Sequence, residues 1–167
     1  MEKELYEKLK KERDNIICSI RRERMVAFYE LLGKTISSIE GAEIENDIIK
    51  IICADGSVYF MCHEQDCCES VSIEDISGDI QDLIGSPVIL AEEVSNSSYD
   101  DDCEAALSGY DDSWTWTYYK LATINGYVTI RWYGASNGYY SESVDFIEVK
   151  SSKEAMIERL KDKKGET

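Results

Sequence analysis

Apolar side chains recur at helical spacing through the first thirty or so residues of the chain. The spacings are seven, four, seven and four residues, and Glu, Lys and Arg occupy most of the other positions. This pattern predicts one amphipathic helix over residues 2–32 that ends before Gly33. At 1.5 Å per residue the helix would be about 45 Å long and would overhang a domain of this size. The apolar positions are Leu9, Ile16, Ile20, Ala27 and Leu31.

Two arrangements accommodate a helix of this length. Either the helix breaks near residues 19–22, or its free part packs on a second copy of the chain. A homodimer through this helix is therefore a hypothesis, which a monomer mass in solution at micromolar concentration would contradict.

From Thr35 onward the apolar period changes to two, which is typical of β-strands. The dipeptides Asp55-Gly56 and Asn125-Gly126 mark hairpin turns. Residues 77–86 are expected to form a short helical or turn segment, and a capping box at Ser151 and Glu154 predicts a last helix to about residue 163. The expected strands are 36–45, 47–53, 58–61, 70–76, 87–95, 113–124, 127–135 and 139–149.

These elements predict an α+β fold. We expect an antiparallel β-sheet core of six to eight strands with a long N-terminal helix and a short C-terminal helix. The expected organisation is an N-terminal helix over residues 1–34, an acidic β-rich domain over 35–150, and a C-terminal helix and tail over 151–167.

The absence of long apolar runs bears on the compartment. No stretch approaches 18 apolar residues and the N-terminus is charged throughout, so we expect neither a membrane span nor a secretory signal. The six cysteines are then expected in a reducing cytoplasm, as thiols or metal ligands rather than disulfides.

Charge is distributed unevenly along the chain. Residues 1–34 and 150–167 each carry a net charge of +2, whereas residues 35–149 hold three Lys/Arg against 23 Asp/Glu, a net charge of −20. Such a domain repels nucleic acid and attracts basic surfaces. Two interpretations stay open: a heavily solvated acidic protein, or a DNA mimic that competes for the nucleic-acid-binding groove of another protein.

Aromatic side chains concentrate in the last third of the chain. Alternation places Trp114, Trp116 and Tyr118 on one face of a strand and makes about half of the aromatics core residues. Few basic residues accompany them, which excludes base stacking and favours a protein-binding surface. The candidate partner-binding residues are Asp100, Asp101, Asp102, Glu104, Asp111, Asp112, Tyr139 and Tyr140.

One short stretch, "MCHEQDCCES", gathers the chain's only histidine and three of its cysteines. Thiolate and imidazole are ligands that zinc prefers, so His63, Cys67, Cys68 and Cys62 form a candidate zinc site. The spacing is not that of a zinc finger, and the fourth ligand stays open among Cys53, Cys62, Cys103, Asp66 and a glutamate.

Two other roles for this stretch stay open. The cysteines also suit small buried core positions at strand ends, with His63 capping a turn. A nucleophilic Cys–His pair is the third possibility, although the stretch lacks an orienting third group and glycines for an oxyanion hole. Carboxylate pairs such as Glu74-Asp75 and Glu92-Glu93 lack companion Lys or Arg, which favours a solvated acidic face over catalysis.

Two motifs carry a resemblance to a known family. H-x-Q-D-C-C-E, which begins at His63, and R-W-x-G-x-S-N-G-Y-Y-S, which begins at Arg131, resemble a domain of unknown function found in small proteins of bacteriophages and prophages. The resemblance covers roughly residues 35–147, and His63, Cys67 and Cys68 match the first motif. It implies a phage context, in which small accessory proteins often counter host defences and some anti-CRISPR proteins are similar in size and acidity.

The expected function follows from charge and resemblance together. We expect a phage-encoded inhibitor of a host defence protein in the host bacterium's cytoplasm, and most specifically an anti-CRISPR protein. It would bind a type II CRISPR effector nuclease and block guide or target DNA loading through its acidic surface. The alternative is a small zinc- or thiol-dependent enzyme that acts on a nucleotide or another small molecule.

Overall fold

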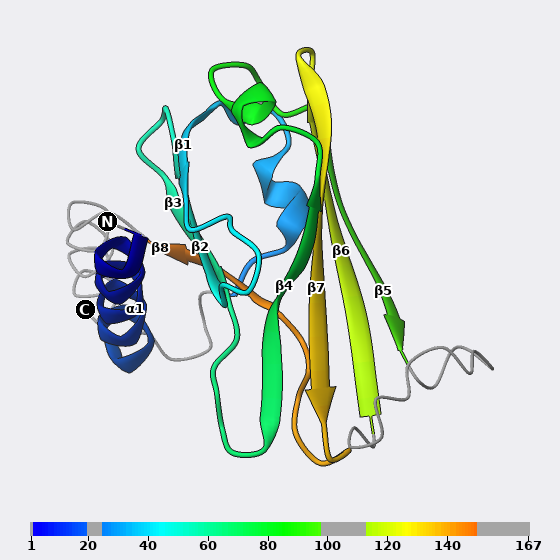
Figure 1. Cartoon of the computed structure of the whole chain (residues 1–167). Coiled ribbons are helices and arrows are strands. Elements are labelled where there is room, and N and C mark those ends of the chain that lie inside the picture. The colour runs from blue at the N-terminus through cyan, green and yellow to red at the C-terminus, as the bar shows by residue number, and fades with distance from the viewer. Residues whose placement is uncertain (1, 20–24, 98–112, 150–167) are drawn as a thin grey trace, which may run out of the picture.

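Two four-stranded antiparallel sheets face each other in the computed structural model of this chain (Figure 1). The structure describes residues 2–19, 25–97 and 113–149. The helix α1 (Glu2–Ser19) lies against the outer side of the first sheet, and a short 3-10 helix, η2 (Phe28–Leu31), lies between the two sheets. No described helix is long and apolar enough to cross a membrane.

The first sheet has the strand order β1-β2-β3-β8. Its first three strands follow one another along the chain, and the turn between β2 and β3 is the predicted Asp-Gly turn, where the Ser57 amide donates to Asp55 Oδ1 at 2.9 Å. The strands are β1 (Ile36–Glu40), β2 (Ile48–Cys53), β3 (Val58–Cys62) and β8 (Asp145–Val149).

The second sheet has the order β4-β7-β6-β5. The chain enters it through the loop after β3 and leaves it through the loop before β8, while the 3-10 helix η3 (Ile80–Leu83) joins β4 to β5. The strands are β4 (Glu69–Ser77), β5 (Leu90–Ser97), β6 (Ser113–Thr123) and β7 (Gly126–Ser136).

The main core lies between the two sheets. Trp132 and Tyr119 of the second sheet and Tyr59 of the first are buried there together with Phe28 of η2. The Phe28 ring packs edge-on against Tyr119, with ring centroids 4.7 Å apart, and against Phe146 at 5.3 Å. Thus η2 is part of the core that joins the two layers.

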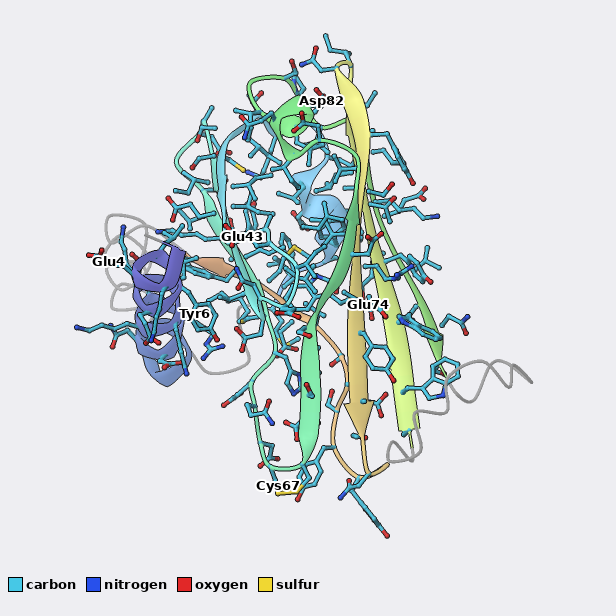
Figure 2. The ribbon with its side chains drawn as sticks, viewed as in Figure 1. Glu4, Tyr6, Glu43, Cys67, Glu74 and Asp82 are labelled. Atoms are coloured by element: carbon cyan, nitrogen blue, oxygen red, sulfur yellow. A yellow bond between two sulfur atoms is a disulfide. The ribbon has the colours of Figure 1, made fainter. Side chains whose placement is uncertain are left out.

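A smaller core lies on the other side of the first sheet, beneath α1. Leu9 packs there on Ile48, Phe60 and Cys62, which the strand period of two turns away from the main core. Polar contacts fix the helix at the rim, because the Tyr6 hydroxyl donates to Asp47 and the Lys50 ammonium pairs with Glu12 at 2.6 Å (Figure 2 labels Tyr6).

The prediction of one long N-terminal helix over residues 2–32 is wrong, because α1 ends at Ser19. After residue 24 the chain is extended at Met25, which bridges Ile147, and the Val26 amide donates to the Phe146 carbonyl. Phe28 and Leu31 then turn into the main core. A straight helix on the outer side of the sheet would keep these two side chains out of that core. The described chain is helical up to Ser19 and extended from Met25.

The expected single sheet is instead a pair of sheets, but each predicted strand has a counterpart in the described part of the chain. The strand predicted over 36–45 ends at Glu40 because Gly41 has a φ of +81°, and a Cβ there would lie 2.9 Å from Leu9 Cδ1. The strand predicted over 139–149 begins only at Asp145. The acidic loop beyond Ser97 and the C-terminal helix predicted over 151–163 lie outside the described residues.

Register decides which aromatic side chains are internal. Thr117 pairs with Trp132 in the β6–β7 ladder, and both are buried, so the face shared by Trp114, Trp116 and Tyr118 is the outer one. The prediction that these three share a face is confirmed.

Candidate functional site

His63 lies in the loop that carries the chain from the first sheet to the second. Its Nδ1 donates to the Ser143 carbonyl at 2.8 Å, and its Nε2 lies 3.0 Å from Glu69 Oε1. The ring therefore joins three segments: the end of β3, the start of β4 and the loop before β8. Because a carbonyl and a carboxylate both accept, both hydrogen bonds form together when both ring nitrogens carry a proton.

Glu69 is the centre of this cluster. Besides His63, its carboxylate accepts hydrogen bonds from the backbone amides of Asp66 and Cys67, the latter at 3.1 Å. These donors, led by the Asp66 amide, lower the pKa of Glu69 to about 2. Glu69 is the last residue of the motif that begins at His63, but it was not singled out as the partner of His63. The available signal was a carboxylate six residues after the only histidine, across a loop between two strands.

The four predicted zinc ligands are placed differently from one another. Cys62 is buried beneath α1, whereas Cys67 and Cys68 are exposed at the tip of the loop (Figure 2 labels Cys67). Across the described residues, no group of three or more His, Cys, Asp or Glu side chains is positioned to hold a metal ion. Zinc at His63 would have to displace a hydrogen bond that the ring now makes. Zinc binding stays a prediction.

The expectation that the cysteines avoid disulfides is corrected at one place, because Cys67 and Cys68 are bonded to each other. Cys53 and Cys62 are free and buried. Burial raises the pKa of the Cys62 thiol to about 12, so the thiol is protonated near neutral pH and is a poor nucleophile. A Cys–His nucleophile pair in this stretch stays a hypothesis, and this raised pKa does not favour it.

Of the predicted partner-binding residues, Tyr139 and Tyr140 lie in the described part of the chain, and the six acidic ones lie outside it. Tyr139 is 92% exposed at a turn where Gly138 has a φ of +88°. The turn is held by Ser136 Oγ, which accepts from the Gly138 amide at 3.0 Å and donates to Glu142 Oε1 at 2.7 Å. The exposed Tyr139 ring is thus presented on a fixed turn.

A polar cavity of about 320 Å³ lies beside this turn, on the inner side of β5 and β6. The Thr115 hydroxyl donates to Glu142 Oε2 at 2.9 Å on one wall. Glu93 forms another wall, and neighbouring protein atoms partly desolvate its carboxyl and raise its pKa. Tyr140 lies at the rim, and the described lining contains two carboxylates and several hydroxyls but no Lys or Arg.

The basic side chains of the acidic region lie against carboxylates. Arg131 pairs with Glu74 at 2.9 Å on the outer face of the second sheet, and Lys50 pairs with Glu12 of α1. Lys120 is opposite Glu92 in the β5–β6 ladder. Many of the other described carboxylates of this region are exposed, although Glu69 and Glu142 are buried.

An aromatic cluster covers part of the same outer face. Trp116 lies 4.6 Å from Trp114 and 5.5 Å from Tyr133, measured between ring centroids. The Trp116 indole donates to Glu74 Oε2 at 2.8 Å, and Glu74 also accepts from Arg131 (Figure 2 labels Glu74). Glu74 thus connects Arg131 to the Trp116 ring, in a cluster that is partly buried because Trp114 is only 7% exposed.

Comparison with family models identifies the domain. A model described as Domain of unknown function (DUF7448) matches residues 29–146. The chain belongs to this family. No curated protein and no solved structure matches the chain.

The DUF7448 match begins within η2 and ends in β8, so it contains the His63–Glu69 cluster, the Tyr139 turn and β5. The helix α1 lies before the matched region. In this chain α1 covers an apolar face of the DUF7448 domain, formed by Ile48, Phe60 and Cys62.

Proposed function

We propose that this DUF7448 protein is a non-enzymatic, acidic protein-binding module that occupies the basic nucleic-acid-binding surface of a partner. The observation that carries the proposal is the net charge of −20 over residues 35–149. A charge of this size exceeds what solubility requires of a domain this small.

The arrangement of charge supports binding to a basic protein. Lys50 and Arg131 each pair with one carboxylate, which leaves the net charge of −20 over residues 35–149 unchanged. A basic groove that binds phosphates would attract this surface over a Debye length of about 10 Å at 0.1 M salt. Carboxylates would then take the place of phosphates on the partner's Lys and Arg side chains.

Exposed aromatic side chains would supply contacts that charge alone does not. Tyr139 is almost fully exposed on a fixed turn, and Trp116 and Tyr133 lie on the outer face of the second sheet. Tyr and Trp are favoured anchors in protein interfaces. The acidic residues would bring the partner close, and these rings would fix its position.

The more specific proposal concerns the partner. A phage-encoded inhibitor acting in the cytoplasm of a host bacterium would meet CRISPR effector nucleases, whose guide and target channels are strongly basic. We propose a type II effector as the partner, with guide or target DNA loading as the blocked step. The acidic segment with Asp100, Asp101 and Asp102 is the proposed main contact.

Direct binding tests this proposal. The dissociation constant for a purified, guide-free type II effector would be measured by biolayer interferometry between about 50 and about 200 mM salt. We expect affinity to fall at least roughly tenfold over this range, because screening weakens attraction between oppositely charged surfaces. Salt-independent binding, or none, would contradict the proposal.

A matched pair of variants separates local from total charge. Neutralising Asp100, Asp101 and Asp102 to Asn should weaken binding several-fold. Neutralising Glu2, Glu4 and Glu7 to Gln removes the same charge from the region of α1, and it should leave affinity within about twofold. Equal losses in the two triple variants would count against the proposed contact.

A further inference from the structure

Three of the four sheet edges accept or exchange backbone hydrogen bonds with other parts of the chain, and β1 does so only at its first residue. At β4, Ile73 exchanges two bonds with residues 45 and 46, both at 2.8 Å. At β8, Val26 donates to the Phe146 carbonyl, and at β1, Gly85 donates to the Ile36 carbonyl. Covered edges of this kind prevent unwanted strand pairing.

At the fourth edge, β5, such backbone hydrogen bonds lie just before the strand, where Val88 exchanges two with Gly33 and Lys34. The segment from Glu92 to Asn96 pairs with β6 on one side, and on its other side it makes no backbone hydrogen bond to the described residues. Four residues in succession, Glu92 to Ser95, are exposed. In Figure 1, β5 lies at the outer margin of the second sheet. With respect to the described residues, the backbone donors and acceptors of this segment are open to an added strand.

Two cavities lie along the inner side of this edge. One has about 350 Å³ and is lined by residues 27–29 and by Ala91, Glu92, Glu93 and Val94 of β5, so apolar side chains share its wall with two carboxylates. The other is the polar cavity of about 320 Å³ at Glu93, which also contains Glu142. Ala91 and Glu93 are two positions apart and point to the same face of β5, since they pair with Leu121 and Tyr119 of β6.

We propose that β5 binds an extended, basic segment of the protein partner as an added strand. One apolar side chain of that segment fills the cavity at Ala91. A Lys or Arg two positions away enters the cavity at Glu93. This inference rests on the proposed function and specifies how the partner is recognised.

The spacing of the cavities matches the geometry of a strand. Side chains two residues apart on a strand point to the same face and lie about 7 Å from each other. The polar cavity offers carboxylate and hydroxyl acceptors, and its aromatic rim at Tyr140 suits a guanidinium or ammonium group. The charge of the cavity and of the whole domain selects a basic segment.

A second copy of the chain is a poorer occupant. Antiparallel pairing of β5 with itself would bring Glu92 and Glu93 of one copy close to the same residues of the other. Like charges in opposed positions destabilise strand pairs. A basic segment from another protein removes this repulsion and neutralises Glu93.

A peptide tests the inference directly. The probe is a short synthetic Thr/Ser peptide with one Leu and one Arg two positions apart, and its affinity for the full-length protein is measured by isothermal titration calorimetry. We expect Glu93→Gln to weaken binding by about five- to tenfold, since a charge-assisted hydrogen bond becomes a neutral one. The exposed control Glu43→Gln, in the loop between β1 and β2 (Figure 2), should change it by less than about twofold.

Backbone methylation of the peptide tests strand pairing and requires no protein variant. In a paired strand, alternate amides point to β5 and to solvent. N-methylation of one alternate set should therefore abolish binding, whereas methylation of the other set should leave it nearly unchanged. Equal effects of the two sets, or equal effects of Glu93→Gln and Glu43→Gln, would overturn the inference.

The outcome is separable from that of the proposed function. If the effector binds in a salt-dependent way but the peptide does not bind, the inference about β5 is wrong and the proposed function as an acidic protein-binding module is retained. If neither binds, both proposals fail.

Discussion

At the scale of single residues, Glu69 connects the loop that contains His63 to the start of β4. Its carboxylate accepts from two backbone amides and lies against the His63 ring, so it stabilises the loop between the sheets. The sequence marked His63 as a candidate zinc ligand or turn cap. It did not predict the contacts with Glu69 and Ser143, because these depend on where the loop before β8 lies. The zinc site stays a prediction.

The lowered pKa of Glu69 makes stability depend on pH. The pKa is about 2 in the folded state and about 4.3 in an unfolded chain. The stability that the charged carboxylate contributes is fully present above the unfolded pKa and is lost as pH falls toward 2. We therefore expect the free energy of unfolding of the wild type to fall more steeply than that of Glu69→Gln between about pH 5 and pH 2.

Urea unfolding at a series of pH values measures this difference. The two variants should differ most near pH 7 and converge in acid. The matched control is Glu64→Gln, an exposed neighbour in the same loop, which should follow the wild-type curve. Parallel curves for the wild type and Glu69→Gln would contradict the role given to this carboxylate.

At the scale of elements, the strands were predictable and their assembly was not. The period of two and the Asp-Gly and Asn-Gly turns are local signals, and each predicted strand is present. The division into two sheets depends on contacts between distant segments, such as β3 with β8. The helix was predicted too long because Ala27 and Leu31 continue the apolar period, although Leu31 is buried between the sheets.

The helix α1 is expected to contribute to stability through Leu9. This side chain is fully buried on the outer face of the first sheet. Leu9→Ala should lower the free energy of unfolding by about 2–5 kcal/mol, because it leaves a cavity in a packed cluster. The exposed control Lys8→Ala should change it by less than about 0.5 kcal/mol in the same denaturant titration. Similar values for the two variants would show that α1 does not pack on the sheet.

The two faces of the second sheet predict unequal roles for its tryptophans. Trp132 is 1% exposed, whereas Trp116 lies on the outer face. Thermal or denaturant unfolding should show a loss of about 3–5 kcal/mol for Trp132→Ala. For Trp116→Ala we expect about 1 kcal/mol, from lost ring contacts with Trp114 and Tyr133. If Trp116→Ala lowered the free energy of unfolding more than Trp132→Ala does, the face of the sheet that carries Trp116 would be the one in the core, which contradicts the β6–β7 register.

The β5 edge also belongs to the element scale. The alternation of residues 87–95 predicted a strand but carried no information about its place in the sheet. An edge position follows only from the order β4-β7-β6-β5, in which distant segments decide which strand is last. For this reason Ala91 and Glu93 were not predicted as site residues. The sequence showed the Glu92-Glu93 pair only as part of a solvated acidic face.

At the scale of the whole molecule, charge is the property that most constrains function. The acidic region carries a net charge of −20, and Lys50 and Arg131 within it are held in ion pairs. Nucleic acid is repelled by such a surface, and basic protein grooves are attracted to it. This property was visible in the sequence, because it depends on composition and not on the arrangement of the strands.

A competition experiment tests the central claim most directly. Labelled target DNA is bound to a purified, guide-loaded type II effector, and its fluorescence anisotropy is followed as the full-length protein is added. The account predicts that anisotropy falls to the value of free DNA when the protein is preincubated with the effector at about equimolar concentration, and that higher salt weakens this competition. Anisotropy that stays at the bound value at low salt and in large excess of the protein would contradict the account.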